Sequence, residues 1–218
     1  MYCPFISRFS GRLLAIAAAL LLTTTAHAVP DDQFREAAAL FSQAASGDNA
    51  TIDKAVEAFT TLLRTEPGNP VLMAYAGAST ARLAGTTMLP WKKISHAEDG
   101  MAMIDKALAM LTPAHDAVVQ RGVPGTLEVR FVAANTFLAV PDFMNRGARG
   151  ATLLTQVLDS PLFAQAPLGF QGGVWLRAAK LAQADKRLDD ARKYLNEVIK
   201  HNAPQADAAR AQLAALPS

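Results

Sequence analysis

Apolar residues recur every three or four positions along most of the chain beyond residue 33, and this spacing strongly limits the folds available to it. Residues 51–65 show the pattern clearly, because their large and small apolar side chains fall on one stripe of a helix. This stripe consists of Ile52, Ala55, Val56, Phe59, Leu62 and Leu63. No segment alternates apolar and polar residues as a half-buried strand would. The sequence therefore predicts an all-α fold with little or no sheet.

Prolines and glycines divide the periodic segments from one another. The helices predicted between these breaks cover residues 33–46, 51–65, 71–83, 90–111, 127–138, 142–158, 173–184, 188–201 and 204–213. Asp31 and Asp32 are expected to cap the first of them. Short breaks between successive helices predict antiparallel pairs, whereas residues 114–125 and 160–171 are predicted to be long irregular loops because they are rich in Gly and Pro.

The helix pairs also carry a repeated pattern of small and large residues. The clearest unit begins at residue 172 and consists of Trp175, Ala178, Ala179 and Ala182, then Ala191, Leu195 and Val198, then Pro204. It resembles the tetratricopeptide (TPR) pattern of W-x2-L-G-x2-Y, A-x3-F and P, which has a period of about 34 residues. A second copy is split around the turn at residues 65–70 and consists of Ala55, Phe59 and Pro67, then Met73, Ala76, Gly77 and Thr80.

The resemblance implies a single TPR-like helical repeat domain over residues 29–218. Its antiparallel helix pairs would stack as a short right-handed solenoid with long loops in the middle. Small residues at fixed places let paired helices approach closely, and neighbouring pairs bury the apolar faces. An irregular helical bundle is the alternative fold.

The middle of the chain resembles a subset of exported bacterial repeat proteins. The resemblance covers most of residues 71–158 and rests on Trp91-Lys92, Gly100 to Ala107, Glu128-Val129-Arg130 and Pro141 to Arg146. It implies a scaffold in the cell envelope and no reaction.

Residues 1–28 have the order of a secretory signal peptide. Arg8 and Arg12 give a charged start, residues 13–22 are an unbroken apolar run, and Ala26-His27-Ala28 is a small-x-small exit. The alternative is an uncleaved membrane anchor, for which this run is short, since a spanning helix needs roughly 20 apolar residues. The sequence predicts a periplasmic or secreted protein with no stable membrane insertion after cleavage at Ala28.

Cleavage would remove the only cysteine, Cys3, so the mature chain could form no disulfide or thiolate metal site. It would also remove Arg8 and Arg12, which leaves 19 of the 21 basic residues against 19 acidic ones. A neutral mature chain gives no support to a nucleic-acid partner.

The sequence also lacks the arrangements that catalysis or metal binding requires. His96, His115 and His201 are not at metal-ligand spacing, and Gly122-x-x-Gly125 is followed by no Lys-Ser or Lys-Thr pair of a phosphate loop. No Gly-x-Ser-x-Gly motif is present. We therefore expect no enzyme, no cofactor and no bound metal.

One group of residues in the middle region is predicted to bind a partner. It consists of Trp91, Lys92, Lys93, Arg130, Asn135, Phe143 and Arg146. In stacked helix pairs the first helix of each pair lines the concave side, so Arg130 and Asn135 are expected to face a groove with Arg146 at its rim. Arginine binds carboxylates through two parallel hydrogen bonds, which indicates an acidic peptide tail or a small carboxylate ligand. The alternative is that Arg130 and Arg146 pair with Glu128, Asp142 or Glu98 and that Trp91 anchors the core.

Three classes of function follow from these features. The first is a periplasmic TPR-like scaffold that mediates protein–protein interaction without catalysis. The second is a small-ligand accessory protein of an envelope transport system, which binds a carboxylate. The third is an enzyme, which is disfavoured because no reactive groups are arranged for it.

Overall fold

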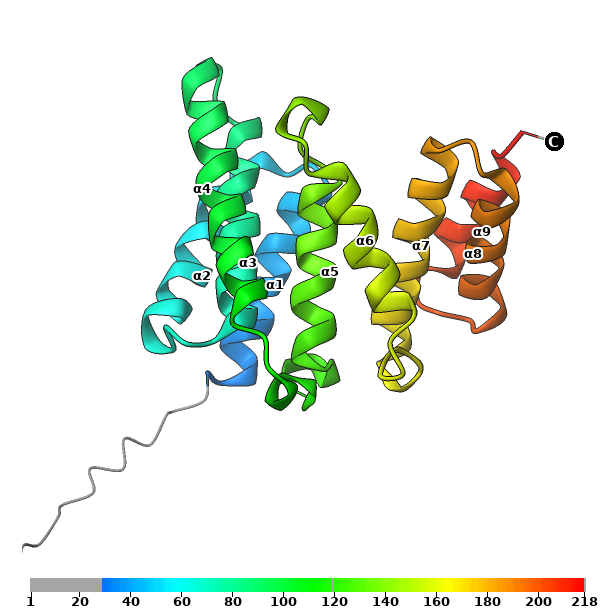
Figure 1. Ribbon diagram of the computed structural model, residues 1–218, viewed down its shortest axis with the longest axis horizontal. Helices are drawn as coiled ribbons and strands as arrows, with labels where there is room; N and C mark the ends of the chain where they lie inside the picture. Colours follow the sequence, from blue (N-terminus) through cyan, green and yellow to red (C-terminus); the bar gives the residue numbers. More distant parts are fainter. Residues whose placement is uncertain (1–28, 119, 218) are drawn as a thin grey trace, which may run out of the picture.

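The computed structural model describes residues 29–118 and 120–217, so the segment 1–28 that the sequence assigns to a signal peptide lies outside the described residues (Figure 1). Nine α-helices make up most of the described chain, and no strand is formed there apart from an isolated bridge. The helices are α1 (Asp31–Ala45), α2 (Ile52–Thr65), α3 (Pro70–Arg82), α4 (Pro90–Ala109), α5 (Gly125–Phe137), α6 (Gly147–Leu158), α7 (Leu168–Ala184), α8 (Leu188–Lys200) and α9 (Ala206–Ala214). The all-α prediction is confirmed.

Helices α1, α5, α6, α7 and α9 start two or more residues away from their predicted positions. Helix α6 starts at Gly147 and not at Asp142, because Asn145 adopts a left-handed backbone with φ of 54° and ends a short 3-10 turn. Helix α7 starts at Leu168, inside a segment predicted to be irregular. Helix α1 includes both Asp31 and Asp32 in its first turn, and neither side chain caps it. Their carboxylates instead lie near the positive end of the helix dipole.

The helices pack in the order in which they occur in the chain. Consecutive helices pack as pairs, α1 with α2, α3 with α4, α5 with α6 and α7 with α8. The second helix of each pair also contacts the helix that follows it, and α3 contacts α5. Figure 1 shows this progression from α1–α4 at one end to α7–α9 at the other.

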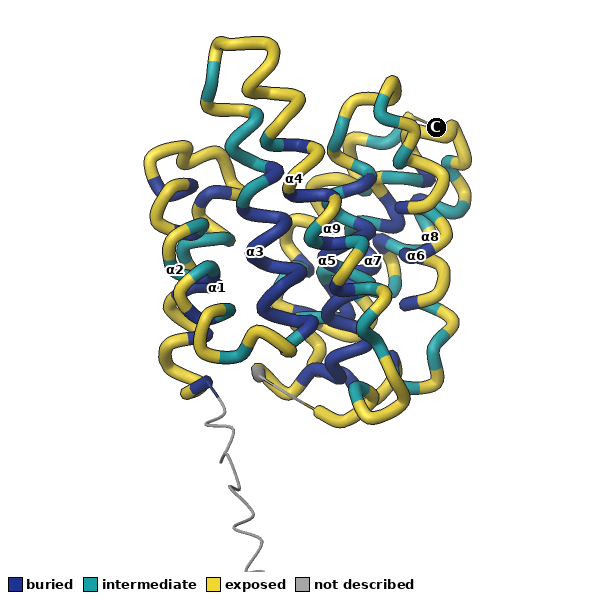
Figure 2. The backbone as a smooth tube through the Cα atoms, turned by 60° about the vertical axis from the view of Figure 1, so that its left-hand side comes forward, coloured by how far each residue is buried: buried dark blue, intermediate teal, exposed yellow. Residues whose placement is uncertain are grey.

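Helix α3 forms the centre of the larger half of the molecule. Eleven of its thirteen residues are buried, and Figure 2 shows it dark blue over most of its length. It can lie among α2, α4 and α5 because many of its residues are small. The closest approach is to α4 at Gly77, where an added Cβ would lie 2.6 Å from the carbonyl oxygen of Gly100.

Aromatic side chains fill the spaces between helix pairs. Phe59 and Tyr75 stack with ring centroids 4.8 Å apart, and Phe34 meets both rings edge-on. The link from α5 to α7 is made by Phe131 and Phe170, whose centroids are 5.3 Å apart. These contacts hold the helices that position the pocket described below.

Candidate functional site: a pocket between α3–α4 and α5

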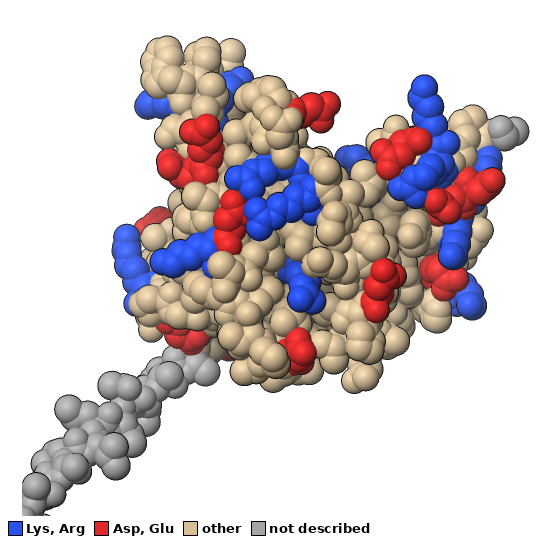
Figure 3. Space-filling model, viewed as in Figure 1, with Lys and Arg blue, Asp and Glu red and all other residues tan. Residues whose placement is uncertain are grey.

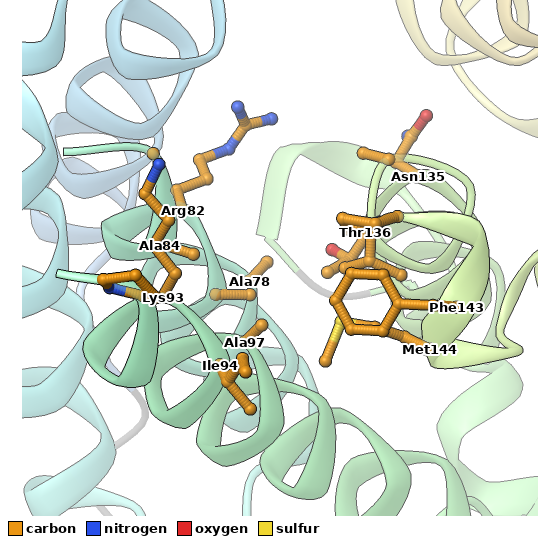
Figure 4. Close-up of a pocket in the computed structure, with 16 residues that line it drawn as sticks. Ala78, Arg82, Ala84, Lys93, Ile94, Ala97, Asn135, Thr136, Phe143 and Met144 are labelled. Atoms are coloured by element: carbon orange, nitrogen blue, oxygen red, sulfur yellow. The ribbon is translucent and has the colours of Figure 1, made fainter. Parts of the chain in front are cut away.

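A pocket of about 560 Å³ lies between the α3–α4 pair and the C-terminal end of α5 (Figure 4). Its lining comes from α3, α4, α5, the turns that follow α3 and α5, and the 3-10 turn at Asp142–Met144. The lining residues are Ala78, Ala81, Arg82, Ala84, Gly85, Pro90, Lys93, Ile94, Ala97, Asn135, Thr136, Ala139, Val140, Pro141, Phe143 and Met144. None of them is acidic, and most are apolar.

Two polar side chains lie at one end of the pocket. Figure 4 shows the Arg82 guanidinium and the Asn135 carboxamide pointing to this end. Arg82 lies over the ring of Phe41, 5.0 Å from its centroid. Behind Asn135, Arg177 of α7 donates a hydrogen bond from Nη2 to the Asn135 carbonyl oxygen at 3.3 Å. Residues from α1, α3, α5 and α7 therefore meet at this end.

Arg82 and Arg177 are half-buried, and neither forms an ion pair with a carboxylate of residues 29–118 or 120–217. Burial lowers the pKa of both guanidinium groups, and the charge of Arg82 lowers the pKa of Arg177 further. The Nε of Arg177 is buried without a hydrogen-bond partner. This end of the pocket is therefore positively charged, and a hydrogen-bond donor behind it, the Nε of Arg177, has no acceptor.

The other end of the pocket is apolar. Ile94 and Ala97 of α4 face Phe143 and Met144 across the cavity in Figure 4. The Phe143 side chain remains 69% exposed and Ile94 43% exposed, so this end opens to solvent. The pocket is thus amphipathic, with Arg82 and Asn135 at one end and a mostly apolar mouth, beside Lys93, at the other.

The tip of the α3–α4 hairpin carries further apolar side chains beside the pocket. Met88 is 87% exposed and Trp91 is 66% exposed, next to the exposed Lys92 and Lys93. No Asp or Glu occurs in residues 67–97. Figures 1 and 2 show this tip projecting beyond the neighbouring helices. We call Met88, Trp91, Lys92, Lys93 and Phe143 the rim.

The structure brings only part of the predicted partner-binding group together. Lys93, Asn135 and Phe143 line the pocket, and Trp91 and Lys92 directly precede Lys93 at the start of α4. Trp91 is largely exposed, so the alternative interpretation of this residue as a core anchor is wrong.

Arg130 and Arg146 lie elsewhere. Arg130 lines a separate depression with residues of α6, since five residues along a helix place it roughly 140° around the axis from Asn135. Arg146 pairs with Asp105 at 3.0 Å and lies over the ring of Phe137. The predicted shared groove of Arg130 and Asn135 is not formed. Arg146 makes an internal ion pair, but its partner is none of the predicted carboxylates Glu128, Asp142 and Glu98.

Figure 3 shows basic and acidic side chains interspersed over the face of the molecule that is seen in Figure 1.

A buried polar cluster that the sequence did not reveal lies on the other side of α3. Tyr75 donates a hydrogen bond to Glu128, and Arg121 pairs with the same carboxylate oxygen. Arg121 also donates to the Tyr75 hydroxyl at 2.6 Å and reaches it from a loop residue with φ of 61°. The sequence indicates Glu128 as a partner for Arg130 or Arg146, and nothing in it shows that the 114–125 loop folds back onto α3.

The position of the Tyr75 hydroxyl gives the protein a predicted sensitivity to alkaline pH. Burial, together with the Glu128 charge, raises the pKa of Tyr75 well above its usual value of 10.0. The native state therefore holds this proton more tightly than the unfolded state. The stability that this tighter proton binding contributes is fully present below pH of about 10, and it is lost as pH rises toward the pKa of Tyr75 in the native state. Tyr75→Phe should therefore reduce the fall in unfolding free energy between pH of about 8 and about 11, as measured by urea denaturation.

Tyr194→Phe serves as the matched control for this effect, because Tyr194 lies on α8, away from the cluster. Equal pH dependence in wild type and Tyr75→Phe would contradict the assignment.

No helix among residues 29–118 and 120–217 combines the length and the apolar character that crossing a membrane requires. The same part of the chain contains no group of three His, Cys, Asp or Glu side chains placed to hold a metal ion. No protein-family model, curated protein or solved structure matches the sequence.

Proposed function

We propose that this protein is an exported, non-catalytic scaffold of TPR-like helix pairs that binds a partner protein in the cell envelope through the rim. The export part rests on the signal-peptide pattern of residues 1–28. The non-catalytic part rests on the absence of catalytic motifs from the sequence. The binding part rests on the exposed side chains of the rim.

The order of helix packing supports a right-handed TPR-like solenoid. In a solenoid each unit contacts its neighbours in the chain, and every second helix packs against the first helix of the next unit. Helix α2 against α3, α4 against α5 and α6 against α7 follow this rule. Small residues stand where paired helices touch, as at Gly77 and Gly100. In this arrangement α1, α3, α5 and α7 line the inner side.

The exposed rim is the observation that carries the binding proposal. Trp91, Met88 and Phe143 are large apolar side chains that remain mostly in water. Aromatic residues and Met are enriched at protein interfaces, and clustered exposed apolar groups mark interaction sites. Lys92 and Lys93 add positive charge, and the nearest acidic residues in sequence are Glu66 and Glu98. The partner surface that complements this rim is apolar with an acidic margin.

Removing the two aromatic groups of the rim should abolish partner capture. We expect Trp91→Ala/Phe143→Ala to retain less than about a thirtieth of the specifically captured partner, since an interface hot spot contributes about 2 kcal/mol or more. The measurement is affinity capture from periplasmic extract, quantified by mass spectrometry against the wild-type protein.

Leu168→Ala is the matched control, because Leu168 is 43% exposed at the start of α7, away from the rim. Melting curves confirm that each variant is folded. If the double variant captures the same proteins in the same amounts as the wild type, the rim is not the binding surface.

A further inference from the structure

The positive end of the pocket between α3–α4 and α5 lacks a counter-charge. Arg82 lines this end and Arg177 lies behind Asn135, yet no Asp or Glu lines the pocket and neither guanidinium is ion-paired within the described chain. Half-buried charges without a partner are costly, so native proteins usually pair them. A bound anion would supply the missing partner.

The shape of the remaining cavity restricts the rest of the ligand. Ala78, Ala81, Ala84 and Ala97 line the cavity with single methyl groups, which keeps it open. Its volume of about 560 Å³ is within the range of small-molecule sites, about 300–1,000 Å³. Apart from Arg82, Lys93, Asn135 and Thr136 the lining side chains are apolar, so the ligand needs an apolar body.

We propose that this pocket binds an amphiphilic monocarboxylate, a linear acyl chain whose carboxylate pairs with Arg82 beside Asn135 and whose chain extends toward Ile94 and Met144. A planar carboxylate matches the two-pronged geometry of a guanidinium. The Asn135 carboxamide lies at the same end and supplies a further donor. The open apolar end beside Phe143 lets the chain enter. This site goes beyond the proposed partner binding, since its ligand is a small molecule and Arg82, which pairs with the carboxylate, is not part of the rim.

The first test is isothermal titration calorimetry with octanoate, decanoate and dodecanoate, each below its micelle concentration. Affinity should rise about fourfold for each added CH2 group while the chain still lengthens within the pocket. Decanol should bind at least about tenfold more weakly than decanoate, because it lacks the charge that pairs with Arg82. Absence of binding for all three acids, or equal affinity for decanol and decanoate, would overturn the proposal.

Two variants locate the site. Arg82→Met keeps an unbranched apolar side chain but removes the guanidinium charge that lies over Phe41, and it should weaken decanoate binding about tenfold or more. Ala139→Trp places a large ring on an exposed residue of the lining and should block the chain. The matched controls are Arg210→Met and Ala208→Trp on α9, which should bind decanoate as the wild type does.

These variants also separate the pocket from the rim. Undiminished decanoate binding by both Arg82→Met and Ala139→Trp would show general association with apolar surface and overturn the proposal. Trp91→Ala should leave decanoate affinity within about twofold of wild type, because Trp91 does not line the pocket. Loss of partner capture by Trp91→Ala with intact decanoate binding, or loss of decanoate binding by Arg82→Met with intact partner capture, therefore decides the two proposals independently.

Discussion

Gly77→Ala is expected to lower the free energy of unfolding by about 3 kcal/mol, because the new methyl group has no space between α3 and α4. Its Cβ would lie 2.6 Å from the carbonyl oxygen of Gly100, 2.9 Å from Cβ of Met103 and 3.0 Å from Ile104. Backbone and buried side-chain stems form this surface, so the two helices must move apart. For a domain of this size the melting temperature should fall by roughly 6–12 °C. Urea denaturation and calorimetry measure both quantities.

Gly147→Ala is the control for the intrinsic effect of alanine in a helix. Gly147 starts α6 with no atom within 4 Å of an added Cβ, so this variant should be neutral or slightly stabilising. Gly100→Ala should resemble Gly77→Ala, since its Cβ would meet the Gly77 carbonyl oxygen. Equal stability of Gly77→Ala and Gly147→Ala would disprove the close crossing of α3 and α4.

Glu128→Leu is expected to cost about 3 kcal/mol of unfolding free energy. Glu128 is 2% exposed and binds both Tyr75 and Arg121. Its removal leaves a partly buried guanidinium and a buried hydroxyl without their acceptor. Breaking a buried pair by removing one partner costs about 3–5 kcal/mol. The Arg121 side chain is 37% exposed, so water can solvate part of its charge after Glu128 is removed. The loss of unfolding free energy should therefore lie at the lower end of that range.

The double variant Arg121→Met/Glu128→Leu separates the cost of a broken pair from the contribution of the intact pair. With both charges gone, no unpaired ion remains, and apolar replacements of similar volume are often close to neutral. We expect the double variant to be more stable than Glu128→Leu by about 2 kcal/mol, as measured by chemical denaturation. A double variant as unstable as the single variant would refute the role of the Arg121 charge.

The helices were predictable from the sequence because their signals are local. Apolar spacing and Pro or Gly breaks define α2, α3 and α8 to within one residue at each end. The start of α6 was not predicted because it depends on the left-handed backbone of Asn145. The start of α7 was not predicted because it depends on neighbouring elements that pack against the glycines near residue 170. Neither has a clear signature in the sequence.

The candidate site was predictable only in part, for a related reason. Exposed aromatic and basic residues at the start of α4 stand out in the sequence, and Phe143 follows a proline that marks a turn. Arg82 instead looks like an ordinary basic residue at the end of a helix, and Arg177 like one of the two basic residues on α7. Their importance comes from the meeting of α3, α5 and α7, which brings together residues about ninety positions apart only once the chain is folded.

The neighbour-to-neighbour packing also bears on how the chain acquires its structure. Most helices contact segments close to them in sequence, so little loop entropy opposes each step and folding should be fast and progressive. Helix α3 is the exception, because its buried residues are covered by α2, α4 and α5 together. Until the chain as far as Phe137 is available to fold, the apolar surface of α3 is exposed to water. During that interval a holdase chaperone would contribute most to preventing aggregation.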